Sequence, residues 1–116
     1  MAEAALVELA PGDVVWVVPD PSVGREQTGR RPAVVVAGAD YLTVVDSLAI
    51  VVPVTTVDRG WPNHVAVRGG ELPQTSWAMT EQVRTISRAR IVGRAGRVTP
   101  ATLEAVRGWV RDFLDL

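Results

Sequence analysis

Apolar and β-branched residues recur up to residue 98 in short runs that polar residues, glycine and proline interrupt. Some runs are continuous, as in strands that are buried on both faces, and others alternate with polar residues, as in half-exposed strands. Proline and glycine near the ends of these runs supply turn signals. The pattern predicts strands at residues 13–18, 32–38, 48–56, 64–68, 77–86 and 90–98.

The hydrophobic period changes after residue 98 to intervals of three and four, the spacing of one face of a helix. Thr99 is a favourable N-cap, Pro100 suits the first helical position, and Val98 can pack against Leu103. We therefore predict a mainly β (α+β) fold: a small, strongly bent SH3-like barrel of five to seven short strands with a C-terminal amphipathic helix. The apolar stripe of that helix comprises Leu103, Val106, Trp109, Val110, Phe113 and Leu114.

Length and composition fit one domain over residues 1–116, with a frayed N-terminus at residues 1–10. With 116 residues, 47% of them hydrophobic, the chain can fill a core and is not disordered as a whole. No apolar run approaches the ~18 residues that span a bilayer, and the N-terminus lacks a basic start, so we expect a soluble cytoplasmic protein. The absence of cysteine and the single histidine exclude a disulfide scaffold, thiol catalysis and a two-histidine metal site within one chain.

Charge is unevenly distributed along the chain, although the formal net charge is only −1. Residues 1–24 hold four acids and no base, whereas residues 25–97 hold ten arginines and six acids. Five arginines and no acid lie between Arg84 and Arg97. An arginine fork grips a phosphate through two hydrogen bonds, which a lysine cannot reproduce. Two interpretations stay open: a phosphate-binding surface, or a solvated face in a protein whose genome favours arginine codons.

Several short motifs follow one another in a distinctive order. They are Gly12-Asp13-Val14-Val15-Trp16-Val17, Asp20-Pro21, Gly24-Arg25-Glu26-Gln27, Gly29-Arg30-Arg31-Pro32-Ala33-Val34-Val35-Val36, Val52-Pro53-Val54-Thr55-Thr56 and Glu81-Gln82-Val83-Arg84-Thr85-Ile86. Each motif is weak by itself. In this order, and in a chain of this length, they resemble the MazF/PemK family of bacterial toxin endoribonucleases from about Pro11 to the C-terminus.

The resemblance implies a specific function. Members of this family are homodimeric toxins of type II toxin–antitoxin pairs, and they cleave single-stranded RNA at a short sequence as mRNA interferases. It further implies cleavage by 2'-hydroxyl attack, with a 2',3'-cyclic phosphate as product and no metal or other cofactor. The expected partner besides RNA is a cognate MazE-like antitoxin, whose extended acidic and apolar C-terminal tail lies across the RNA site.

The same resemblance assigns two candidate catalytic residues, Arg31 and Thr55, and the need of the reaction for a base adds Glu26 as a third. Arg31 matches the family's catalytic arginine and could hold two phosphate oxygens in the transition state, although its position alone also fits a surface arginine. Thr55 matches the second catalytic residue and could donate to the scissile phosphate, although threonine at a strand end is also a good β-former. Glu26 is the best carboxylate to accept the 2'-hydroxyl proton, and its alternative role is a salt bridge with Arg25 or Arg30.

Further residues are candidates for RNA contacts: Arg25, Gln27, Trp61, Gln82 and Arg84. Gln82 and Arg84 match a segment that lines the groove in relatives, and we expect a base-edge contact from the first and a phosphate contact from the second. Trp61 could stack on an unpaired base, or belong to the core or an interface. The single histidine, His64, is expected to pack or to cap a strand rather than to act as a general base.

Two other functions stay open at this stage. A protein-targeting toxin on the same barrel would be similar to the gyrase inhibitor CcdB, which lacks the arginine and threonine arrangement and uses a C-terminal tryptophan. This chain instead ends Phe113-Leu114-Asp115-Leu116. A non-catalytic RNA-binding barrel would bind RNA without cutting it. For the endoribonuclease function, the family resemblance implies that the segments 39–47 and 69–75 are loops that select the RNA sequence.

Overall fold

A computed structural model describes residues 8–19 and 29–116. Its antiparallel strands form one bent seven-stranded sheet in the order β4-β5-β3-β2-β1-β7, with β6 also paired to β3. The strands are β1 (Asp13–Val17), β2 (Arg31–Val35), β3 (Leu48–Thr55), β4 (His64–Ala66), β5 (Trp77–Met79), β6 (Arg84–Ser87) and β7 (Ile91–Arg97). The helices are α2 (Ala39–Val44) and α3 (Pro100–Phe113), with single 3₁₀ turns at η1 (Thr80–Gln82) and η2 (Arg88–Arg90).

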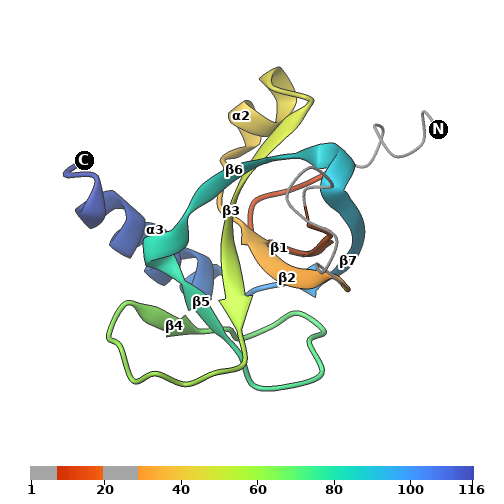
Figure 1. The fold of residues 1–116 in the computed structure, drawn as a ribbon. Coiled ribbons are helices and arrows are strands. Elements are labelled where there is room, and N and C mark those ends of the chain that lie inside the picture. Colours follow the sequence, from red (N-terminus) through yellow and green to blue (C-terminus); the bar gives the residue numbers. More distant parts are fainter. Residues whose placement is uncertain (1–7, 20–28) are drawn as a thin grey trace.

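The sheet curls so that β1, β2, β3, β6 and β7 surround a common interior (Figure 1). β6 continues into β7 through η2, and the sheet is bent rather than closed. The prediction of a mainly β, strongly bent SH3-like fold with a C-terminal helix is therefore confirmed.

The central strands are buried on both faces, because successive side chains along a strand point to opposite sides. This explains why residues 33–37 and 48–54 are continuously apolar. The inner core, inside the curl, contains Val15, Val17, Ala33, Val35, Ala37, Leu42, Ala49, Val51, Ile86 and Ile91. The outer core, which includes a residue of α3, contains Val14, Val34, Val36, Val52, Val54, Ala78, Ala95, Val98 and Val106.

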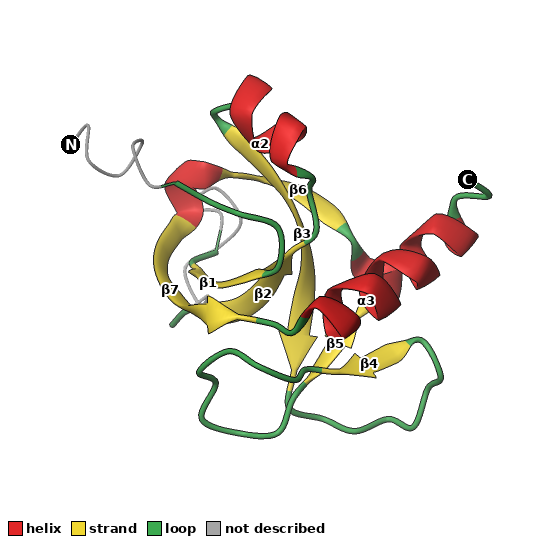
Figure 2. Cartoon of the chain, turned by 180° about the vertical axis from the view of Figure 1, so that it is seen from behind, coloured by secondary structure: helices red, strands yellow, loops and turns green. Residues whose placement is uncertain are grey.

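Helix α3 begins as predicted and runs across the outside of the sheet near β4 and β5 (Figure 2). The Thr99 hydroxyl oxygen accepts a hydrogen bond from the Thr102 backbone N–H at 3.1 Å, and Val106 is fully buried. Burial along the apolar stripe ends in the last turn, where Phe113 and Leu114 are 50% and 57% exposed. No helix in the described ranges is long and apolar enough to cross a membrane.

Two predicted elements differ from the structure. The predicted strand 77–86 is interrupted by η1, which separates β5 from β6. On β3, Val54 and Val51 are three residues apart, whereas their partners Ala78 and Arg84 are six residues apart. The three extra residues form a bulge that leaves the ladder. In addition, the predicted loop at 39–47 contains the short helix α2.

Candidate active site

An open groove of about 260 Å³ lies at one end of the inner core. Its buried lining residues, such as Val17 and Ile86, belong to that core, and three arginines join them. We call it the arginine groove. It is lined by Val17, Pro19, Arg31, Pro32, Ala33, Val51, Pro53, Arg84, Ile86 and Arg90.

Strand register brings Arg31 and Arg84 to the same groove. Arg31 lies opposite Val17 in the β1–β2 ladder, and Arg84 lies opposite Val51 in the β3–β6 ladder. Directly opposed residues of antiparallel strands project from the same face of a sheet. Because Val17 and Val51 face the inner core, both arginines project at its open end. No acidic residue is among the described residues that line the groove.

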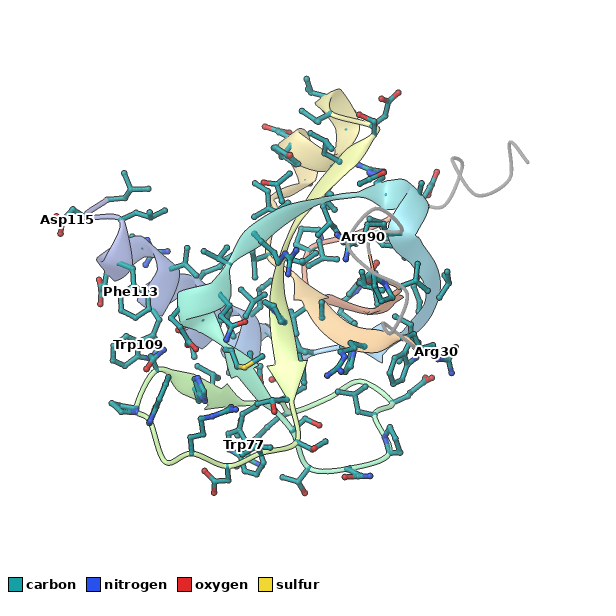
Figure 3. The ribbon with its side chains drawn as sticks, viewed as in Figure 1. Arg30, Trp77, Arg90, Trp109, Phe113 and Asp115 are labelled. Atoms are coloured by element: carbon teal, nitrogen blue, oxygen red, sulfur yellow. The ribbon has the colours of Figure 1, made fainter. Side chains whose placement is uncertain are left out.

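Arg90 is a third arginine of the groove, and its Nε donates to the Val18 carbonyl oxygen at 2.8 Å. The Val18 N–H in turn donates to the Arg90 carbonyl oxygen at 2.9 Å. Figure 3 shows Arg90 within the curl of the strands. In the sequence, Arg90 is one of the five arginines between Arg84 and Arg97, and nothing there distinguishes it from the other four. Arg84 and Ile86 share a face of β6, but the η2 turn (Arg88–Arg90) breaks the alternation, so the sequence carried no signal that Arg90 joins them.

Arg30, which precedes Arg31 in the sequence, does not line the arginine groove. Its guanidinium carbon lies 4.6 Å from the centroid of the Trp16 ring, in a cation–π arrangement outside the inner core (Figure 3). Arg30, just before β2, and Arg31, the first residue of β2, thus direct their charges to different faces of the sheet. Only one member of the Arg30-Arg31 pair contributes to the groove.

Thr55, the second predicted catalytic residue, ends β3 two residues beyond Pro53. It is half-buried and is not among the residues that line the groove. The recorded β2–β3 register ends at Ala33 opposite Pro53, and two further residues along the same register would bring Arg31 opposite Thr55. The Thr55 hydroxyl oxygen accepts a hydrogen bond from the Val57 N–H at 3.1 Å, which leaves its own proton available to a ligand.

Of the other predicted site residues, Arg25, Glu26 and Gln27 lie outside the described residues. Trp61 and Gln82 are exposed, but neither is among the residues that line the arginine groove. The structure therefore brings Arg31 and Arg84 together and places Trp61 and Gln82 around a different feature, which is centred on a buried histidine.

That histidine is His64, the first residue of β4, whose prediction as a packed residue is confirmed. Its Nε2 lies 3.0 Å and 3.1 Å from the two carboxylate oxygens of Glu81, and its ring centroid lies 4.8 Å from that of Trp61. Burial acts to raise the pKa of Glu81. The hydrogen bond and electrostatic attraction of His64, together with hydrogen bonds from the backbone and from Asn63, outweigh that effect, so the pKa of Glu81 lies below its ordinary value.

Other arginines of the 84–97 run have structural partners. Arg88 donates to the backbone carbonyl oxygens of Leu42, Val45 and Leu48, and so fixes the end of α2. Arg97 Nε donates to Asp13 Oδ1 at 3.0 Å, and Arg94 Nε lies 3.7 Å from Asp13 Oδ2. These intramolecular partners of Arg88, Arg94 and Arg97 fit neither interpretation of the arginine run, a phosphate-binding surface or a solvated face.

Comparison with known proteins identifies the family. Residues 10–114 match the model of the PemK-like, MazF-like toxin of type II toxin–antitoxin systems. The chain belongs to the PemK/MazF toxin family. It is 37% identical over 104 residues to the Endoribonuclease toxin MazF of Escherichia coli (strain K12), covering 89% of this chain and 91% of that protein. It is 32% identical over 112 residues to Endoribonuclease MazF9 of Mycobacterium tuberculosis, covering 90% and 95% respectively.

Solved structures of PemK/MazF toxins share the fold. The MazE–MazF complex (Form-II) from Deinococcus radiodurans matches with a TM-score of 0.80 and 28% identity, over 95% of this chain and 98% of that one. MazF (Form-I) from the same organism matches with a TM-score of 0.77 and 29% identity, over 95% and 99% respectively. The family resemblance inferred from the sequence motifs is confirmed, and these findings do not favour the CcdB-like alternative.

Proposed function

We propose that this PemK/MazF toxin is a sequence-specific endoribonuclease that cleaves single-stranded RNA by 2'-hydroxyl attack, with Arg31, Thr55 and Glu26 as catalytic residues. The observation that carries the proposal is the arginine groove. Arg31 and Arg84 come from two separate family motifs, and the register of the bent sheet places them in one hollow with Arg90. An RNA phosphate is the anion that such a cluster of forked donors suits.

In this reaction the 2'-oxygen attacks the adjacent phosphorus, and the bond from phosphorus to the 5'-oxygen breaks. Negative charge builds on the two non-bridging oxygens, and the Arg31 guanidinium donates two parallel hydrogen bonds to them. Arg84 binds a neighbouring phosphate and keeps the strand in register. The apolar lining, which includes Val17 and Val51, excludes water from one side of the phosphate and so strengthens these electrostatic interactions.

Proton transfers complete the step. The Thr55 hydroxyl donates a hydrogen bond to a phosphate oxygen and keeps its proton, while its oxygen accepts a hydrogen bond from the Val57 N–H. Glu26 accepts the proton of the 2'-hydroxyl, and the departing 5'-oxygen takes a proton from water. The products are a 2',3'-cyclic phosphate and a 5'-hydroxyl, and the step needs no metal ion or cofactor.

The proposed partners are RNA, a second copy of this chain and a MazE-like antitoxin. The groove combines three arginines with apolar side chains, which suits an extended peptide that is both acidic and apolar. Such a tail would compete with RNA for Arg31 and Arg84. We place this activity in the cytoplasm, where RNA is available, and light scattering of the purified protein would test the homodimer.

The testing experiment compares wild type, Arg31→Ala and Arg30→Ala on a long single-stranded RNA in EDTA. Arg30→Ala is the matched control, because it removes the same charge from the adjacent residue, which packs on Trp16. We expect wild type and Arg30→Ala to cut the RNA at similar rates, leaving 2',3'-cyclic phosphate ends. Arg31→Ala should be slower by roughly 100- to 1,000-fold, the usual loss when a transition-state donor is removed. An RNA that wild type leaves intact would refute the proposal.

A further inference from the structure

A second polar cluster lies outside the arginine groove, where the 56–63 loop between β3 and β4 meets the bulge η1. We call it the His64–Glu81 clamp; it consists of Asn63, His64, Thr80 and Glu81. Glu81 belongs to a motif that carried the family resemblance, and the proposed catalytic step does not use either His64 or Glu81.

The clamp joins the loop to the bulge through reciprocal hydrogen bonds. Thr80, which is fully buried, donates from its hydroxyl to the Asn63 carbonyl oxygen at 2.8 Å and accepts from Asn63 Nδ2 at 3.2 Å. Asn63 Nδ2 also donates to Glu81 Oε1 at 2.8 Å. Together with the contacts of His64, these bonds engage both carboxylate oxygens of Glu81.

The protonation of His64 follows from its partner. An ionised carboxylate only accepts hydrogen bonds, so His64 Nε2 carries a hydrogen and donates a hydrogen bond to Glu81. The other ring nitrogen, Nδ1, is buried and has no partner among the described residues. Burying a polar nitrogen without a partner costs free energy that an apolar side chain of similar size would avoid. The contribution of a histidine at this position is therefore its bond to Glu81 rather than its packing.

The clamp orients two exposed side chains. Gln82 Nε2 donates to Glu81 Oε2 at 3.4 Å, which turns the amide oxygen of Gln82 away from the carboxylate. Trp61 is 49% exposed, and its ring lies against that of His64 at a centroid separation of 4.8 Å and an angle of 45°. An aromatic ring that can stack on a base and an amide that can bond a base edge are thus fixed on one support.

We infer that His64 and Glu81 are positioning residues that determine RNA sequence selectivity, by holding Trp61 and Gln82 as a base-recognition subsite outside the arginine groove. The inference rests on the proposed endoribonuclease function. Gln82 is only two residues from Arg84, so a strand gripped in the groove at Arg84 would present a nearby base to this subsite. The clamp acts on which sequence is accepted, and the arginines act on the phosphate.

The test measures kcat and KM for wild type, His64→Leu, Glu81→Ala and His64→Gln on the preferred RNA site and on single-base variants of that site. We expect His64→Leu and Glu81→Ala to lower the ratio of kcat/KM between the preferred and variant sites by about tenfold or more, because loosened groups lose their alignment. His64→Gln should restore the ratio, since its amide N–H can reach Glu81. Thr99→Ala, which removes the cap of α3, is the control for a stability loss that leaves selectivity unchanged.

An unchanged ratio in His64→Leu and Glu81→Ala, with all rates lowered equally, would overturn the inference and make the clamp merely structural. If His64→Leu does not fold, Asn63→Ala removes one donor to Glu81 from a half-buried residue and should lower the same ratio; an unchanged ratio there also overturns the inference. If wild type cuts no RNA, the proposed function fails and takes this inference with it. If wild type cuts RNA but the ratio of kcat/KM between preferred and variant sites is the same in the clamp variants, the inference alone fails.

Discussion

The ladder between β1 and β7 carries arginines at both of its ends, in contrasting surroundings. At one end Val17 lies opposite Ile91, next to Arg90 and the arginine groove. At the other end, about 13 Å along the strand, Asp13 lies opposite Arg97. Asp13 is fully buried and bonds to Arg97, whereas the described lining of the groove contains no acid.

The difference between these ends is set by one carboxylate rather than by the arginines themselves. Arg84, Arg90, Arg94 and Arg97 belong to one acid-free run of sequence. Asp13, some 80 residues earlier, neutralises the last two because β1 pairs with β7. An arginine run becomes an anion site only where the fold leaves its charges without such an acid, and this proposal can be tested at both ends.

Among the tests of this comparison, the largest expected effect comes from Arg31→Lys. A lysine keeps the charge but cannot hold two phosphate oxygens in a fixed fork, so we expect the cleavage rate to fall by roughly 10- to 100-fold. Arg97→Lys is the matched change at the other end of the ladder, where the side chain is 56% exposed, and should leave the rate within about twofold. The measurement is the initial rate of cleavage of one RNA by each variant. Equal losses of rate in Arg31→Lys and Arg97→Lys would contradict the contrast between the two ends of the ladder.

A smaller effect, on stability, is expected for Asp13→Asn. Both carboxylate oxygens of Asp13 accept hydrogen bonds, one from Arg97 and one from the Ala10 N–H at 2.8 Å, and an amide would turn a donor toward one of them. We expect the free energy of unfolding to fall by about 1–3 kcal/mol, measured by urea denaturation. The exposed Asp112→Asn should change it little. Cleavage per folded molecule should be unaffected, and a loss there would assign Asp13 to the site.

The smallest expected effect is on the salt dependence of RNA binding. Removing one phosphate contact reduces the slope of log K against log salt by about 0.7 for a single strand. We expect this change for Arg84→Ala on an RNA made uncleavable by a 2'-deoxy sugar at the cut site. Arg94→Ala should leave the slope nearly unchanged, because the Arg94 guanidinium already faces Asp13. A slope that responds equally to both variants would show that the paired arginines also contact RNA.

Much of the fold was predictable because its signals are local. The continuous valines of β1, β2 and β3 indicated strands buried on two sides, and the Thr99 cap located the start of α3. The bulge at η1 was not predictable, because Thr80 and Glu81 are held out of the strand by Asn63 and His64 from 17 residues earlier. Likewise, the end of α2 depends on Arg88, more than 40 residues away.

The site was predictable only in part, for the same reason. The motifs indicated Arg31 and Arg84, and the ladders place both in the arginine groove. The role of Arg90 depends on its bond to Val18, and that pairing is visible only once β1 and β7 are aligned. The partnership of His64 with Glu81 also joins separate elements, so a histidine read by itself suggested packing and no more.

The bulge at η1 has a consequence for how toxins of this architecture diversify. Its three extra residues occupy no place in the ladder with β3, so their number and identity can change while Arg84 stays opposite Val51. An insertion, deletion or substitution there would alter the group presented at Gln82 without displacing Arg84. Under the proposed function, a change confined to the bulge would therefore alter which RNA sequence is accepted and leave the position of Arg84 unchanged.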